Sequence, residues 1–407
     1  ATTGNVAVTA DGSGTIAGAV LADLVSIAVD GNLLVTGAVE SDTTTVTLSA
    51  GQDADIQATV TAQTALSITA GDDLTTTAAV VAEGATLTLD GGVDVTIGST
   101  ADASTTITMT AGNNMAVNGA IGSVDGDDVV LTADTGSITT TATIEADNEV
   151  TLTAGQNITT GATVTADGDD VNLTTLTGSI ATGAAVTAAQ NVLVSAGQDV
   201  TGGADITATA GNISIIADGD VDMLTNAAAL LAGGSITVDA GQDALLEEVT
   251  PGGALAENAT LTAGVDLTLG GPVAAALANI IARAGNDINQ DGILTAENVT
   301  LTADTGSLDS DGAITANTDV LVNVGQDADF NAAVLATTGN VTIDAGNDVV
   351  TSVAGTLTAT TGNVAVTADG SGTIAGAVLA DLVSIAVDGN LLVTGVVESD
   401  TTTVTLS

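Results

Sequence analysis

The 407-residue sequence lacks most of the side chains on which protein chemistry depends. It contains no cysteine, histidine, tryptophan or tyrosine, one phenylalanine and two prolines, and Arg283 is its one basic residue. Without cysteine the chain forms neither disulfides nor thiolate metal sites. This absence fits either a reducing compartment or a secreted fold that buries enough surface to need no cross-links.

Positive charge is also nearly absent, since 50 acidic residues face one basic residue and the net charge is -49. Such a chain repels nucleic acid and anionic membrane surfaces, so we expect neither as a partner. High charge with almost no aromatic residues is typical of disorder. However, 45% of the residues are apolar, mostly Ala, Val, Leu and Ile, which is typical of a packed protein.

Long hydrophobic runs are missing as well. The longest apolar stretch, residues 272–282, is interrupted by Asn279 and is shorter than the roughly 18 residues that a membrane span needs. We therefore expect no membrane insertion. No signal peptide is visible, but the sequence opens inside a repeat, so this says nothing about export.

A near-perfect duplication joins the two ends of the sequence. Residues 359–407 repeat residues 1–49 with one difference, Val396 in place of Ala38. We interpret residues 1–358 as one long tandem unit and residues 359–407 as the start of the next, so the sequence is an uncapped segment of a longer array. Such recent duplication favours a function that depends on the length of the protein.

A second, shorter period lies within the long one. The tetrad Ala-Gly-x-Asp/Asn recurs along the chain, and related turns such as Asp134-Thr135-Gly136 fill the gaps between its copies, so the basic unit has about 20–22 residues. Copies of the tetrad begin, among other places, at Ala50, Ala70, Ala111, Ala154, Ala196, Ala240, Ala284 and Ala345.

Each short unit has the pattern of half-buried strands. In residues 150–170, apolar residues alternate with Thr, and Gly, Asn and Asp separate segments of three to five residues. Only residues 274–284 are also compatible with a helix. Strands this short become stable when identical coils stack on one another. The sequence therefore predicts an all-β fold, a parallel β-helix of about 19 coils that runs as a single continuous solenoid over residues 1–407. The alternative, a left-handed helix of hexapeptides, requires a six-residue spacing that the turns do not keep.

The pattern resembles the filamentous haemagglutinin-like repeats of large bacterial exoprotein adhesins. The segments Glu149–Ile158, Ala196–Val200 and Asn298–Ala303 carry this resemblance, which covers essentially the whole chain. It implies a right-handed β-helical shaft that serves an adhesin, a cytolysin or a passive fibre. The near-complete loss of Lys and Arg departs from the family, and the family's secretion cap and receptor-binding tip lie outside this sequence.

The rare residues fit the same pattern. Phe330 aligns with Ile56 at an inward position, and Met109 alternates with Ile107, so we expect both Phe330 and Met109 in the core. Arg283 occupies an outward position and is expected to pair with acids on neighbouring coils.

The two prolines mark the least regular unit. Pro251 and Pro272 bracket residues 252–271, where we expect a widened turn.

The charge density predicts a cation atmosphere. About 19 coils spaced about 4.8 Å apart carry one net charge per roughly 1.9 Å, close to the one per roughly 1.7 Å of duplex DNA. We therefore expect divalent cations such as calcium as diffuse counterions that stiffen and bundle the shaft. Amide side chains in the same turns are expected to relieve repulsion between stacked acids: Gln52, Asn113, Gln156, Gln198, Gln242 and Asn286.

Dedicated sites are not predicted. The acidic turns at residues 125–128 and 167–170 offer clustered oxygens, but neither matches a known calcium motif. Glu247 and Glu248 form the only adjacent Glu pair, and on a strand the two would point to opposite faces. We assign no catalytic, cofactor-binding or metal-binding residue and expect no enzyme.

Three functions remain open. The first is the structural shaft of an extracellular, cell-surface or matrix filament for adhesion or biofilm attachment, which self-associates end to end or laterally and reaches a host or neighbouring-cell surface through regions outside this sequence. The second is an acidic, calcium-stiffened matrix scaffold. The third is binding to ice or mineral through the Thr rows 45–47, 106–108 and 151–153. This third reading requires a flat Thr face on consecutive coils, whereas we expect these rows to alternate with Asp and Ala positions.

Overall fold

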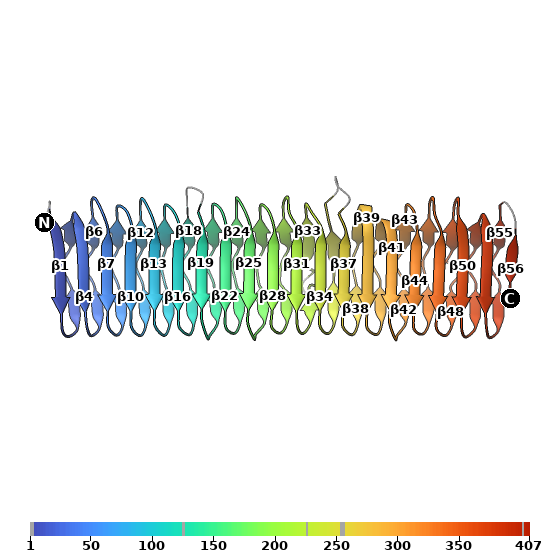
Figure 1. The fold of residues 1–407 in the computed structure, drawn as a ribbon, viewed down its shortest axis with the longest axis horizontal. Coiled ribbons are helices and arrows are strands. Elements are labelled where there is room, and N and C mark those ends of the chain that lie inside the picture. The colour runs from blue at the N-terminus through green and yellow to red at the C-terminus, as the bar shows by residue number, and fades with distance from the viewer. Residues whose placement is uncertain (1–3, 124–126, 225–226, 253–256, 401–402) are drawn as a thin grey trace. The chain divides into compact units, whose positions relative to one another are not determined.

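The computed structural model describes residues 4–123, 127–224, 227–252, 257–400 and 403–407, and in these ranges the regular elements are short β-strands with no helix. Strands pair in parallel with strands one turn away along the chain, which makes a parallel β-solenoid of about 19 turns of roughly 21 residues (Figure 1). No helix in the described ranges could cross a membrane. The predicted fold class is confirmed, and the right-handed sense stays a prediction.

Two compact units divide the chain, residues 1–198 and residues 199–407. One continuous solenoid over residues 1–407 stays a prediction.

Each turn of the first unit contains one longer strand followed by two short ones. In the turn that begins at Val150, these strands are β22 (Val150–Ala154), β23 (Ile158–Thr160) and β24 (Val164–Ala166). The next turn opens with β25 (Val171–Thr175), which lies in register with β22. The strand lengths of three to five residues and the repeat predicted for residues 150–170 are confirmed.

The longer strands of the first unit form one column. They are β1 (Asn5–Ala10), β4 (Leu24–Val29), β7 (Val46–Ala50), β10 (Leu66–Ala70), β13 (Leu87–Gly91), β16 (Ile107–Ala111), β19 (Val129–Ala133), β22, β25 and β28 (Val192–Ala196).

The second unit repeats this design. Its longer strands are β31 (Ile213–Ala217), β34 (Ile236–Ala240), β37 (Ala259–Ala263), β39 (Val273–Ala284), β41 (Leu294–Ala303), β44 (Val320–Val324), β47 (Val341–Ala345), β50 (Asn363–Ala368), β53 (Leu382–Val387) and β56 (Val404–Leu406).

Two strands of the second unit are exceptionally long. In β39 and β41 the third strand of one turn runs directly into the first strand of the next, with a register shift between Ala275 and Asn279. The stretch 274–284, which the sequence also allowed as a helix, is therefore a bulged strand. Its alternating apolar residues still point inward around the bulge.

Inward side chains stack in columns of Val, Leu, Ile and Ala. Phe330 on β45 (Ala328–Phe330) is 0% exposed and lies in register between Ser310 and Thr351. Met109 is likewise fully buried, between Leu89 and Leu131. Both core predictions are confirmed. Each large apolar side chain so buried contributes about 1.5–3 kcal/mol to folding.

The proline-flanked region is only partly described. Pro251 follows β36 (Glu248–Thr250) and is buried, whereas Pro272 precedes β39 and is exposed. Residues 253–256 of the predicted widened turn lie outside the described residues.

Candidate functional surfaces: polar ladders, acidic turns and a hydroxyl face

The glycine of the Ala-Gly-x-Asp/Asn tetrad lets turn backbones stack closely. A Cβ atom on Gly71 would lie 2.3 Å from the carbonyl oxygen of Gly51, one turn earlier, and a Cβ on Gly112 would lie 2.1 Å from that of Gly92. Real Cβ contacts are never this short. The tetrad therefore needs glycine because neighbouring turns occupy the space of a side chain.

The last residue of the tetrad accepts a hydrogen bond from the next turn. In the first unit, Asp53 Oδ1 accepts from the backbone N–H of Asp73 at 3.3 Å, and Asp73 Oδ1 accepts from that of Asp94 at 3.1 Å. We call this column the turn ladder. Its bonded members in this unit are Ser13, Asn32, Asp53, Asp73, Asp94, Asn114, Ser137, Asn157 and Ser179.

The turn ladder is more acidic in the second unit. Asp220 Oδ1 accepts from the N–H of Asp243 at 3.0 Å, and the N–H of Asp220 donates to Asp199 Oδ1 at 3.0 Å. Its bonded members are Asp199, Asp220, Asp243, Asp266, Asp287, Ser307, Asp327, Asp348, Ser371 and Asn390. Many of the acidic residues therefore satisfy backbone donors that the short strands leave unpaired.

A second column, the entry ladder, lies directly before the longer strands. In the first unit Asp170 Oδ1 accepts from the N–H of Asn191 at 2.7 Å, and in the second unit Asp319 Oδ1 accepts from the N–H of Asn340 at 2.7 Å. Both ladders follow one rule, in which a side-chain oxygen of one turn holds an amide of the next. Sequence reasoning missed this rule, although the recurrence of Asp, Asn and Ser at one turn position was its visible signal.

The sequence predicts that amide side chains at six positions relieve repulsion between stacked acids, and two of the six, Asn113 and Asn286, donate to an Asp of the previous turn. Asn113 Nδ2 donates to Asp94 Oδ1 at 3.1 Å, and Asn286 Nδ2 donates to Asp266 Oδ1 at 2.8 Å. Gln156 instead donates to the Thr135 carbonyl.

Arg283 pairs with an acid of the next turn. Its Nη2 lies 2.7 Å from Asp304 Oδ2, and the two side chains are 60% and 38% exposed. The hydrogen bond to Asp304 and its charge raise the pKa of Arg283. The predicted outward pairing is confirmed, and at this exposure it contributes little to stability.

Several carboxyls outside the ladders have perturbed pKa values. Asp309 on β42 (Leu308–Ser310) stacks in register on Asp329 of β45. Burial, followed by the charges of neighbouring carboxylates, raises the pKa of both. Burial raises the pKa of Asp102 on β15 (Ala101–Ala103). Conversely, hydrogen bonds from the Thr318 hydroxyl and the Asn317 amide lower the pKa of Glu297.

The two acidic turns considered for calcium use their oxygens within the solenoid. In residues 167–170, Asp170 Oδ1 is held by the backbone and side chain of Asn191, and the charge of Asp170 raises the pKa of Asp169. Of residues 125–128, 125 and 126 lie outside the described residues, and Asp128 Oδ1 accepts from Asn148 at 2.7 Å. Within the described ranges no three acidic side chains are placed to hold a metal ion together.

The Glu pair and a surface groove offer little reactive chemistry. Glu247 lies in the bend between β35 (Ala244–Leu246) and β36, and Glu248 accepts a bond from the Thr250 hydroxyl at 3.2 Å.

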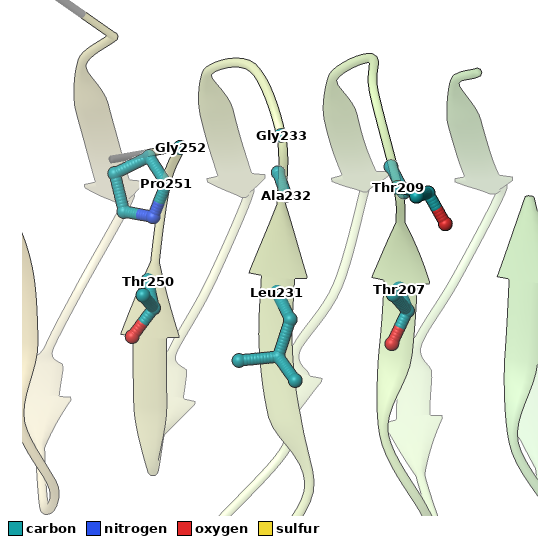
Figure 2. A pocket seen from close by; sticks show the side chains of 9 residues that line it. Thr207, Thr209, Leu231, Ala232, Gly233, Thr250, Pro251 and Gly252 are labelled. Carbon is teal, nitrogen blue, oxygen red and sulfur yellow. The ribbon is translucent and has the colours of Figure 1, made fainter. Parts of the chain in front are cut away.

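A groove of about 540 Å³ crosses β30 (Ile206–Ala208), β33 (Ala229–Ala232) and β36 (Figure 2). Its lining consists of neutral residues: Thr207, Ala208, Thr209, Leu231, Ala232, Gly233, Thr250, Pro251 and Gly252. None of these carries an ionisable side chain.

The Thr rows are more continuous than the sequence suggested. In the first unit Thr47, Ser67, Thr88 and Thr108 lie in register on four successive longer strands, and Thr151 falls in the same column. Thr45 and Thr106 precede their strands. The expected alternation with Asp and Ala positions is therefore wrong for this stretch, because the period of about 21 residues returns each Thr to the same outward position.

Comparison of the chain with protein-family models, with curated proteins and with solved structures finds no match.

Proposed function

We propose that the chain is the structural shaft of a giant extracellular repeat protein of the filamentous haemagglutinin-like kind, which forms a cell-surface or matrix filament for adhesion or biofilm attachment. One observation supports it above the others. At the junction of the long repeat, β50 of the second copy pairs in register directly with β47 of the first, from Val341 with Val364 to Ala345 with Ala368. Val366 is buried there, with 1% of its surface exposed.

The duplicated sequence also adopts the same register twice. Asn5 pairs with Leu24 in the first copy, and Asn363 pairs with Leu382 in the second. A new unit therefore needs no cap and no adaptor, so tandem duplication lengthens a solenoid without changing its cross-section.

Contour length tests this proposal. A chain with two tandem copies of residues 1–358 should form a thin fibre about twice as long as a chain with one copy, in electron micrographs. Two compact globules joined by a linker would contradict the proposal. Protease treatment of intact cells tests the location, because a surface filament is digested and an internal protein is not.

A further inference from the structure

Eight successive longer strands of the first unit, β7 to β28, present two outward columns rich in hydroxyl groups. The first column holds Thr47, Ser67, Thr88, Thr108, Val130, Thr151, Asn172 and Leu193, and the second holds Ser49, Thr69, Asp90, Thr110, Thr132, Thr153, Thr174 and Ser195. We call these sixteen positions the hydroxyl face. Twelve of them are Thr or Ser.

The hydroxyl face is nearly free of charge on a chain of net charge -49. Asp90 is its one ionisable residue, while the entry ladder borders it with Asp128, Glu149 and Asp170. The column of the second unit that corresponds to Thr132 and Thr153 contains Asp239, Arg283 and Asp344 among its residues. Two like-charged chains approach each other at the lowest electrostatic cost where neither presents carboxylates.

A groove and an exposed leucine lie side by side on this face. The groove measures about 420 Å³ and follows the second column over Thr132, Thr153, Thr174 and Ser195, with Asp134 as the one ionisable residue of its lining. Leu176 lines it directly after β25 and is 76% exposed. A projecting apolar side chain beside a groove is self-complementary under a two-fold axis, because each copy can place its leucine in the groove of the other.

The area of the hydroxyl face is large enough for a specific interface between two copies of the chain. Eight strands spaced about 4.8 Å apart and five residues long at about 3.3 Å per residue cover roughly 600 Å² per copy. A pair therefore buries roughly 1,200 Å² in total, the lower end of the range for specific interfaces.

We propose that two copies of the chain pair side by side through the hydroxyl face, with Leu176 of each copy in the groove of the other. This inference rests on the proposed shaft function, which it extends from a single solenoid to a laterally paired filament. The acidic borders meet across the interface, so pairing strengthens as salt screens them.

Sedimentation of the full chain at low and high salt tests the proposal. The wild-type chain should dimerise, and more tightly at high salt. Thr132→Glu with Thr153→Glu places two charges on adjacent turns of the hydroxyl face and should leave monomers. Thr139→Glu with Thr159→Glu is the matched control, because these exposed residues also stack in register on adjacent turns but belong to the column of shorter strands β20 (Ile138–Thr140) and β23. The control should still dimerise.

Leu176→Ala should weaken pairing by roughly tenfold or more, whereas Leu277→Ala, at another exposed leucine, should not. A wild-type chain that stays monomeric at every salt concentration overturns the proposal. The proposal also fails if the Thr132→Glu/Thr153→Glu variant and the Thr139→Glu/Thr159→Glu control weaken association equally. Monomers that bind growing ice crystals would assign the face to ice instead. Electron micrographs separate this failure from that of the shaft, since unpaired fibres refute only the pairing and the absence of fibres refutes the shaft.

Discussion

At the residue scale, the acidic side chains of the turn ladder act chiefly as hydrogen-bond acceptors. Asp220 stands between two such bonds, donating from its backbone to Asp199 and accepting at Oδ1 from the N–H of Asp243. The bond needs only a side-chain oxygen as its acceptor. The amide oxygen of asparagine can therefore replace the carboxylate oxygen of aspartate without loss of the bond.

Substitutions at Asp220 separate this role from that of charge. Asp220→Ala should lower the free energy of unfolding by about 1 kcal/mol, because it leaves the Asp243 N–H without its acceptor. Asp220→Asn keeps the oxygen, removes one negative charge and should be neutral or slightly stabilising. Urea unfolding followed by circular dichroism measures both. Equal losses for the two variants would show that charge, and not the acceptor, is what the site needs.

The buried hydroxyl of Thr160 gives a second prediction at this scale. Thr160 is fully buried on an inward position of β23, and within the described residues its Oγ1 has no hydrogen-bond partner. Thr160→Val should therefore raise the free energy of unfolding by about 1 kcal/mol, because the hydroxyl is buried without compensation.

Thr175 is the matched control for this substitution. It is also buried, but its Oγ1 donates to the Gly178 carbonyl at 2.7 Å, so Thr175→Val should destabilise the fold. A destabilised Thr160→Val variant would mean that this hydroxyl is satisfied, for example by a buried water molecule.

The sequence was a good guide to individual core residues and a poor one to polar contacts. Alternation of apolar residues with Thr placed Phe330 and Met109 inward correctly. Hydrogen bonds between residues about 21 positions apart, such as Asp53 with Asp73, depend on a register that composition does not reveal. The sequence therefore does not predict that side chains of the acidic turns accept backbone hydrogen bonds from the next turn.

At the scale of the elements, stacked turns depend on glycine. Gly71→Ala should lower the free energy of unfolding by more than about 1 kcal/mol, since its Cβ would lie 2.3 Å from the Gly51 carbonyl oxygen. Gly122→Ala on β18 (Ile121–Ser123) is the control, because the nearest atom to its Cβ would be Asp102 Oδ1 at 3.6 Å. Denaturation midpoints should separate the two variants, and equal effects would contradict the stacking argument.

Strand type, strand length and period were predictable at this scale because the two-residue alternation and the turn residues repeat in every coil. The merging of two strands in β39 and β41 was not. There the corner residues before Asn279 and Asn298 include no Gly or Pro, so no local signal marks the missing turn. The hydroxyl face was missed for a related reason, because it exists only once the turns are placed in register.

At the scale of the whole molecule, net charge dominates the response to the solvent. Raising monovalent salt should raise the unfolding temperature, because it screens repulsion among 50 acidic side chains. If the counterions are diffuse, a chelator added at constant ionic strength should leave the unfolding temperature unchanged. A drop in unfolding temperature on chelation would reveal a specific calcium site.

The stability of the fold should also depend on pH, and it should rise as the pH falls from neutral. Asp102, Asp309 and Asp329 have raised pKa values in the folded chain. The stability that they contribute is complete below the unfolded pKa of about 3.9 and is lost as pH rises through their higher folded values. Mild acidification from neutral pH should therefore stabilise the fold. Asp309→Asn with Asp329→Asn should flatten this profile, and an unchanged profile would show that these two carboxyls do not cause it.

Fibre diffraction from aligned native filaments tests whether stacked turns of a parallel β-solenoid build an extended shaft. The strands run across the axis, so the filaments should give a meridional reflection at about 4.8 Å, the spacing of successive turns. Filaments that lack this reflection, or native material composed of compact globules that do not align, would contradict this architecture.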